Sequence, residues 1–240
     1  MQHCSHHYIL KISCPATSGI VAAVTTFLAQ SGCYISEMAQ FDDEFHERFF
    51  MRAVFRGNSG GELDLAQIEK GFAGVAERFA MQWELHSQAQ PMRVLLMVSK
   101  YDHCLNDLLY RYHKGEMHMQ ITAIVSNHLD LRPMAEREGI RFIYLPVNKD
   151  NKAQQEAELL KIVQDTQTEL VVLARYMQIL SDDLCRHLSG RAINIHHSFL
   201  PGFKGAKPYH QAWDRGVKLI GATAHYVTSD LDEGPIIEQE

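Results

Sequence analysis

The sequence predicts an α/β protein built from two units, an N-terminal α+β unit and a larger open sheet with helices on both faces. Three observations support this prediction. Strand and helix patterns follow the order β-α-β-β-α-β through residue 87, which is the ferredoxin-like arrangement. After a short linker at residues 88–91, continuous apolar runs alternate with helical patterns. Apolar residues make up 46% of the 240 residues, which is typical of a chain that buries a large core.

The elements of the N-terminal unit are predicted from changes in hydrophobic period. Residues 8–14 (YILKISC) alternate apolar and polar side chains, which indicates a strand. Residues 19–32 place apolar side chains at helical spacing and end on Gly32, a residue that commonly terminates helices. Two further strands at residues 33–43 and 48–55 suggest a hairpin. A loop at residues 57–61, an amphipathic helix at residues 63–80 and a closing strand at residues 81–87 complete the unit.

The second unit alternates strands with helices, which favours an open, mostly parallel, Rossmann-like sheet. Residues 92–99 (MRVLLMVS) form a continuous apolar run, as expected for a parallel strand buried on both faces. Further strands are expected at residues 121–127, 140–146, 169–175, 192–196 and 222–227, with a short one after the acidic loop that follows. Helices are expected at residues 104–116, 132–139, 152–166 and 181–190, the last with Ser181 as its N-cap.

Charge and cysteine content narrow the classes of function. The formal net charge is −6 and no basic block occurs, so nucleic-acid binding has no support. No apolar run reaches the roughly 18 residues of a membrane span, and residues 1–7 lack the layout of a signal peptide. Five scattered cysteines are typical of reduced thiols in a cytoplasmic protein. No HExxH or zinc-ribbon spacing occurs, so no metal is expected, and the terminus around His3 and Cys4 is predicted to be functionless.

A first group of candidate site residues follows from the rule that ligands of open α/β sheets bind outside the carboxyl ends of the strands. Asn194 and His196 are two residues apart at a strand end, so their side chains should project from the same face. Asp232 lies in an acidic loop further along the chain. An amide and an imidazole can donate hydrogen bonds to an oxyanion, and a carboxylate can orient water or move a proton. An isolated acidic turn is more often simply solvated, so spacing alone leaves the role of Asp232 open.

A second candidate is the segment at residues 173–180 (LARYMQIL), which follows another predicted strand. Its apolar side chains Met177, Ile179 and Leu180 can wall a pocket, although core packing explains the same spacing. The turn at residues 97–106 contains no glycine, whereas phosphate-binding turns use glycine to bring backbone N–H groups close to the anion. The sequence therefore does not predict a phosphate site of the usual kind there.

Nucleophilic catalysis has little support in the sequence. Ser198 lies near Asn194 and His196 but lacks the G-x-S-x-G pattern of an exposed catalytic serine. Cys104 and Cys185 have no neighbouring base along the chain. We therefore expect direct attack by water or an amine on a carbonyl carbon, without a covalent intermediate.

Two stretches resemble known families. The sequence SCPATSGIVAAVTTFLAQSGCYI is similar to the ACT domain, a small regulatory fold that often binds amino acids, although Ala16 stands where such domains often carry Asp. The N-x-H pattern at residues 194–196, followed by Leu200-Pro201, His225 and a D-x-G-P pattern from Asp232, resembles the formyltransferase family that uses 10-formyltetrahydrofolate. With YDHCLNDLLYRYHKGE and the ACT-like front, nearly the whole chain resembles the formyltetrahydrofolate deformylase family.

This resemblance implies hydrolysis of 10-formyltetrahydrofolate by water, with no cofactor or metal, in one-carbon metabolism and purine biosynthesis. It implies that Asn194, His196 and Asp232 are catalytic and that His225 supports Asp232. The substrate-binding residues that it implies are Arg175, Met177, Ile179 and Leu180. It implies an ACT-like regulatory or oligomerisation domain at residues 1–87, a linker at residues 88–91 and a formyltransferase-fold hydrolase domain at residues 92–240. It also implies a cytoplasmic homo-oligomer, an amino-acid effector, and further residues after Glu240 in the full-length protein.

Two alternatives stay open at this point. The first is a formyltransferase with an amine acceptor, for which the bulky SKYDHC turn would obstruct a phosphorylated substrate. The second is a non-catalytic amino-acid sensor. Amino acids alone should stabilise a sensor against thermal unfolding, whereas folates should stabilise the enzyme.

Overall fold

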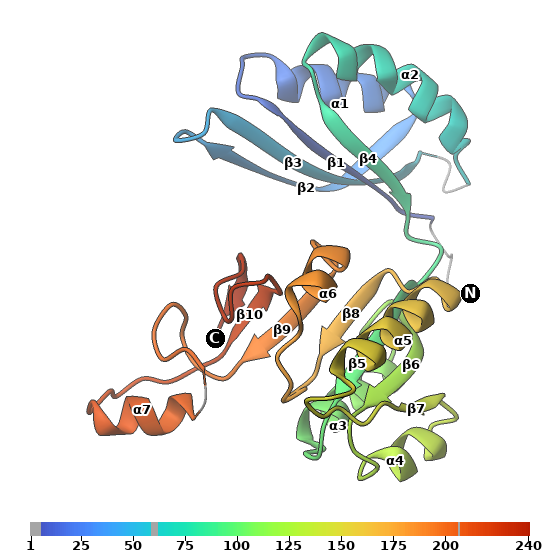
Figure 1. Cartoon of the computed structure of the whole chain (residues 1–240). Helices are drawn as coiled ribbons and strands as arrows, with labels where there is room; N and C mark the ends of the chain where they lie inside the picture. Colours follow the sequence, from blue (N-terminus) through green and yellow to red (C-terminus); the bar gives the residue numbers. More distant parts are fainter. Residues whose placement is uncertain (1–5, 59–61, 206) are drawn as a thin grey trace. The chain divides into compact units, whose positions relative to one another are not determined.

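Figure 1 shows the computed structural model of the protein, which describes residues 6–58, 62–205 and 207–240. The chain divides into two compact units, Met1–Gln90 and Pro91–Glu240. The terminus around His3 and Cys4 and the centre of the loop predicted at residues 57–61 lie outside the described residues.

The first unit is an antiparallel sheet covered on one face by two helices (Figure 1). Its strands lie in the order β2-β3-β1-β4. Alternate side chains of β1, from Tyr8 to Cys14, are buried against the helices, which explains the period-two pattern of this stretch. The element order agrees with the sequence prediction: β1 Tyr8–Pro15, α1 Ile20–Gln30, β2 Cys33–Asp43, β3 Arg48–Gly57, α2 Leu65–Arg78 and β4 Gln82–Ser87.

The second unit has a seven-stranded sheet in the order β11-β10-β9-β8-β5-β6-β7. Strands β9 to β7 in this order pair in parallel, while β10 pairs antiparallel with both β9 and β11. The mostly parallel sheet predicted from the sequence is thereby confirmed. The strands are β5 Met92–Val98, β6 Met119–Ser126, β7 Phe142–Tyr144, β8 Leu170–Leu173, β9 Ala192–His196, β10 Thr223–Tyr226 and β11 Ile236–Gln239. The helices are α3 His103–His113, α4 Arg132–Arg137, α5 Lys152–Asp165, α6 Asp182–His187 and α7 Pro208–Asp214.

Strand β5 explains why the apolar run predicted at residues 92–99 is continuous. Leu95 and Met97 belong to the core cluster that includes α5 and α6, whereas Val94, Leu96 and Val98 belong to the cluster with α3 and α4. Helices therefore cover both faces of the sheet, and every residue of this part of the strand has apolar neighbours.

Three details differ from the prediction or sharpen it. Helix α7 is not predicted from the sequence, because only Pro208 and Ala212 of its seven residues are buried and the apolar period is weak. Strand β8 ends at Leu173 rather than at residue 175, because Arg175 has a φ of 60°, which a strand does not accommodate. Ser181 caps α6 as predicted, since its side chain accepts a hydrogen bond from the N–H of Leu184.

Candidate active site

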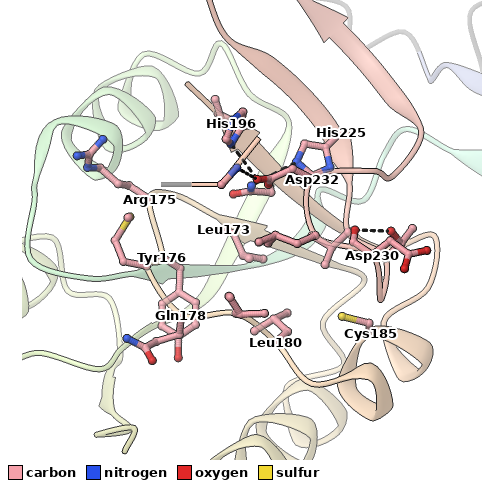
Figure 2. Close-up of a pocket in the computed structure, with 18 of the residues that line it drawn as sticks. Leu173, Arg175, Tyr176, Gln178, Leu180, Cys185, His196, His225, Asp230 and Asp232 are labelled. Carbon is pink, nitrogen blue, oxygen red and sulfur yellow. Dashed lines mark hydrogen bonds and ion pairs between the residues drawn. The ribbon is translucent and has the colours of Figure 1, made fainter. Parts of the chain in front are cut away.

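One cavity of about 290 Å³ lies where β8 and β9 end and where the loop after β10 returns to the sheet. Figure 2 shows Arg175, Leu180, His196, His225 and Asp232 around it. All eight residues that the sequence and its resemblance propose for a site line this cavity: Arg175, Met177, Ile179, Leu180, Asn194, His196, His225 and Asp232.

Strand pairing brings the polar members of this group together. Asn194 on β9 lies directly opposite His225 on the antiparallel strand β10. The amide nitrogen Nδ2 of Asn194 lies 3.3 Å from Nε2 of His225. His196, two residues after Asn194, lines the same cavity, as the alternation of side chains along a strand predicts.

Two backbone carbonyls decide the tautomers of the buried histidines. His196 Nε2 lies 3.1 Å from the carbonyl oxygen of Phe203, and His225 Nδ1 lies 2.9 Å from that of Tyr226. Because a carbonyl oxygen only accepts, each of these ring nitrogens carries a proton and donates it. Nδ1 of His196 is therefore left to face Asp232, and Nε2 of His225 accepts from the amide of Asn194.

Asp232 is held between the two imidazoles (Figure 2). Its Oδ2 lies 3.4 Å from His196 Nδ1, and its Oδ1 lies 3.8 Å from His225 Nε2. The N–H of Gly205 donates to Oδ2 at 3.0 Å. Asp232 has a φ of 56°, a conformation that is uncommon outside glycine and clusters at functional sites.

Burial separates Asp232 from the other acidic residues of its loop. Asp232 is 7% exposed, whereas Asp230 and Glu233 are exposed to solvent. Gly234 explains how the loop comes so close to the sheet, because a Cβ at this position would overlap the carbonyl group of Tyr226. The sequence left open whether this acidic turn is simply solvated. That interpretation holds for Asp230 and Glu233 but not for Asp232.

The apolar wall of the cavity comes from the segment between β8 and α6. Leu180 is 9% exposed and belongs to the core, so packing explains it. Met177 and Ile179 are 56% and 61% exposed, and both line the cavity. Exposed large apolar side chains that gather at a cavity are typical of a ligand-binding surface.

Arg175 lies at the start of this wall. Its guanidinium lies over the ring of Tyr101, 4.9 Å from the ring centroid. Its Nε is buried and has no hydrogen-bond partner among the described residues. Tyr101 belongs to the glycine-free turn after β5, so an aromatic ring and a guanidinium lie where a glycine-rich turn would bind a phosphate.

Sequence reasoning missed several groups at the site. The carbonyl of Phe203 and the N–H of Gly205 orient His196 and Asp232, yet backbone groups have no sequence signature. His197 also lines the cavity, and burial lowers its pKa, with the neighbouring His196 adding to the shift. Burial raises the pKa of the Tyr176 hydroxyl to about 12, and nearby Glu156 adds to the shift, so this hydroxyl stays protonated at neutral pH.

The described ranges contain neither a cluster of potential metal ligands nor a helix that could span a membrane. Residues 6–58, 62–205 and 207–240 contain no group of three or more His, Cys, Asp or Glu side chains that could hold a metal ion. In the same part of the chain, no helix is both long and apolar enough to cross a membrane.

Comparison with known proteins places these features in a family. Residues 92–240 match the family described as formyl transferase. The formyltetrahydrofolate deformylase of Corynebacterium sp. (strain P-1) is 52% identical over 233 residues, which cover 97% of this chain and 81% of that protein. The crystal structure of formyltetrahydrofolate deformylase from Burkholderia mallei is 54% identical with a TM-score of 0.89, and covers 98% of this chain and 83% of that one. The corresponding structure from Pseudomonas syringae pv. tomato is 48% identical with a TM-score of 0.92, over 98% and 78% of the two chains.

Proposed function

Because the chain belongs to the formyltetrahydrofolate deformylase family and hydrolyses 10-formyltetrahydrofolate to tetrahydrofolate and formate, we propose that Asn194, His196 and Asp232 are its catalytic residues. The observation that carries this proposal is the arrangement of a half-buried amide, a buried imidazole and a buried carboxylate beside an apolar wall. The wall residues Arg175, Met177, Ile179 and Leu180 are assigned to the folate, and His225 to the support of Asp232.

In the proposed reaction, water attacks the formyl carbon and the carbonyl oxygen becomes an oxyanion. Asn194 has two amide hydrogens, of which one is directed to His225. The other has no hydrogen-bond partner among the described residues, so it can donate to the oxyanion. His196 donates from Nδ1 when both of its nitrogens carry protons, because Nε2 is occupied by the carbonyl of Phe203. Both donors stabilise charge that develops only in the transition state.

Asp232 manages the proton in this mechanism. Its carboxylate orients the water molecule and accepts a proton as the new C–O bond forms. It then delivers that proton to N10 as the bond between the formyl carbon and N10 breaks. The products are formate, tetrahydrofolate and one proton released to solvent, so the step requires no cofactor.

The glycine-free turn after β5 supports water as the acceptor instead of a phosphorylated amine. Tyr101 and Arg175 stack where the phosphate of such an acceptor would need backbone N–H groups. The relatives named above are deformylases, which also disfavours the alternatives of an amine-dependent formyltransferase and of a non-catalytic sensor.

The first experiment measures formate release from 10-formyltetrahydrofolate without any amine acceptor. We expect multiple turnovers, with formate and tetrahydrofolate produced in equal amounts. Glycinamide ribonucleotide should not increase the rate of deformylation. Formyl transfer to that amine at a rate comparable with hydrolysis would contradict the proposal.

The N-terminal unit is assigned to oligomerisation. Strand β2 is the edge of its sheet, and an unpaired edge is a template for pairing with another strand. Large apolar side chains are exposed on β2 and on the turn and strand that follow: Tyr34, Met38, Phe41, Phe45 and Phe50. We propose that this edge pairs with a second copy of the chain. An amino-acid effector at this ACT-like unit, a role in purine biosynthesis and a cytoplasmic location stay predictions.

The oligomer is tested by measuring molar mass in solution. We expect a multiple of the 27.4 kDa chain mass, and a shift toward the monomer when Phe41 on the β2 edge is replaced by Lys. Tyr110→Lys is the matched control, because Tyr110 is similarly exposed but lies on α3 in the other unit. A wild-type mass of one chain would contradict the proposed pairing.

A further inference from the structure

We propose that Ser99 and Asn127 form a buried positioning pair that sets the shape of the folate-binding wall. This inference rests on the proposed function, because it concerns the same cavity. Neither residue is among those that line the cavity, and neither belongs to the catalytic group.

The hydroxyl of Ser99 joins three strand ends. Ser99 follows β5 directly and is 3% exposed, and Asn127 follows β6 directly and is 7% exposed. Ser99 Oγ donates to Asn127 Oδ1 at 2.7 Å and accepts from the N–H of Met177, beyond the end of β8, at 3.1 Å. The single hydroxyl hydrogen is therefore committed to Asn127, and this leaves a lone pair directed at the backbone of the wall.

The wall depends on this contact because its middle has few hydrogen bonds from the backbone. Residues 174–180 have no regular secondary structure. One end is anchored by the N–H of Ala174 on the carbonyl of Met97, and the other by the N–H of Ser181 on Glu156. Between these two anchors, the N–H of Met177 donates to Ser99. Among the described residues, no other backbone N–H in this middle part is hydrogen-bonded to the sheet.

Tyr176 and Leu180 pack against the core, but packing holds the other two apolar side chains of the wall only weakly. Met177 and Ile179 are more than half exposed, so their side chains find few partners until a ligand covers them. The backbone of Arg175 has a positive φ, which is an unfavourable conformation for a residue with a side chain. Such a segment keeps its shape before the ligand binds only if hydrogen bonds hold its backbone. Without them, the segment would have to become ordered upon binding, and the loss of conformational entropy would reduce affinity.

The pair is expected to act on binding and not on the chemical step. Asn194, His196 and Asp232 are oriented by His225, Phe203 and Gly205. In the described part of the chain, Ser99 hydrogen-bonds to Asn127 and Met177 and to none of these groups. A disturbance of the wall therefore weakens the ground state and the transition state alike, which raises KM and leaves kcat unchanged.

The test replaces Ser99 with Ala in the full chain. We expect KM for 10-formyltetrahydrofolate to rise about tenfold, as for the loss of a buried hydrogen bond, with kcat within about twofold of wild type. The dissociation constant of the product tetrahydrofolate, measured by quenching of protein fluorescence, should rise by the same factor. Asn127→Ala should shift both constants in the same direction, because it leaves the Ser99 hydroxyl free to rotate away from Met177.

Ser126→Ala is the matched control. Ser126 is fully buried at the end of β6, but its hydroxyl accepts from the N–H of His128 and does not contact the wall. We expect KM and the dissociation constant to stay near wild type in this variant. Equal effects of Ser99→Ala and Ser126→Ala would overturn the proposal, as would a lower kcat with unchanged KM in Ser99→Ala. The proposed function has its own test, since it fails if the wild-type protein releases no formate. The binding of tetrahydrofolate is measured without turnover, so the effect of Ser99→Ala on binding can be judged in either case.

Discussion

Asp232→Asn lowers kcat for the hydrolysis of 10-formyltetrahydrofolate by about a thousandfold, within the range that a positioned general acid–base contributes. The substitution keeps the size of the side chain, and the remaining carbonyl oxygen can still accept from the N–H of Gly205. An amide cannot take a proton from water, however, so the attacking nucleophile is no longer activated. KM should change little, because Asp232 is assigned to the water and not to the folate.

The measurement is steady-state formate release, with thermal unfolding of both proteins as the check of the fold. Glu233→Gln is the matched control, because it removes a charge from the next residue of the same loop. Glu233 is exposed and pairs with Lys204 at 2.7 Å, and exposed ion pairs contribute roughly 0–1 kcal/mol. We expect this variant to keep kcat within about twofold of wild type. Near-normal turnover of Asp232→Asn would remove Asp232 from the mechanism.

His196→Ala lowers kcat by about a hundredfold to a thousandfold, as expected when one of two donors to an oxyanion is lost. The carbonyl of Phe203 holds His196 in the orientation that directs Nδ1 toward Asp232 and the cavity. Ala lacks a donor and leaves a space that water can enter. The lost hydrogen bond stabilises the transition state more than the ground state, so its loss raises the activation barrier.

This prediction is tested by kcat and KM for the variant, with His210→Ala as the control. His210 is an exposed histidine on α7, so its removal should leave both constants unchanged. A decrease in kcat of less than about tenfold with unchanged KM for His196→Ala would show that His196 has only a structural role. A large rise in KM with normal kcat would instead place His196 in folate binding.

The sequence alone was sufficient for the features that depend on neighbouring residues. The continuous apolar run of β5 predicts a strand buried on both faces, because successive side chains point to opposite faces and those from Val94 to Val98 are all apolar. The structure shows apolar clusters on both sides of this strand. The two-residue spacing of Asn194 and His196 predicts that they share a face, because side chains alternate along any strand. The Ser181 cap follows from local hydrogen bonding in the same way.

Tertiary structure decided which distant groups meet and which carboxylate is buried. Side-chain chemistry does not distinguish Asp232 from Asp230, and the approach of the loop to β10 at Gly234 buries the former. The tautomer of His196 depends on the carbonyl of Phe203, and the wall depends on a hydroxyl 78 residues before Met177. The periodicity of a segment indicates only which of its side chains are buried. The hydrogen-bond partners of His196 and Met177 depend on strand pairing and on the paths of loops, which bring together residues that no local pattern connects.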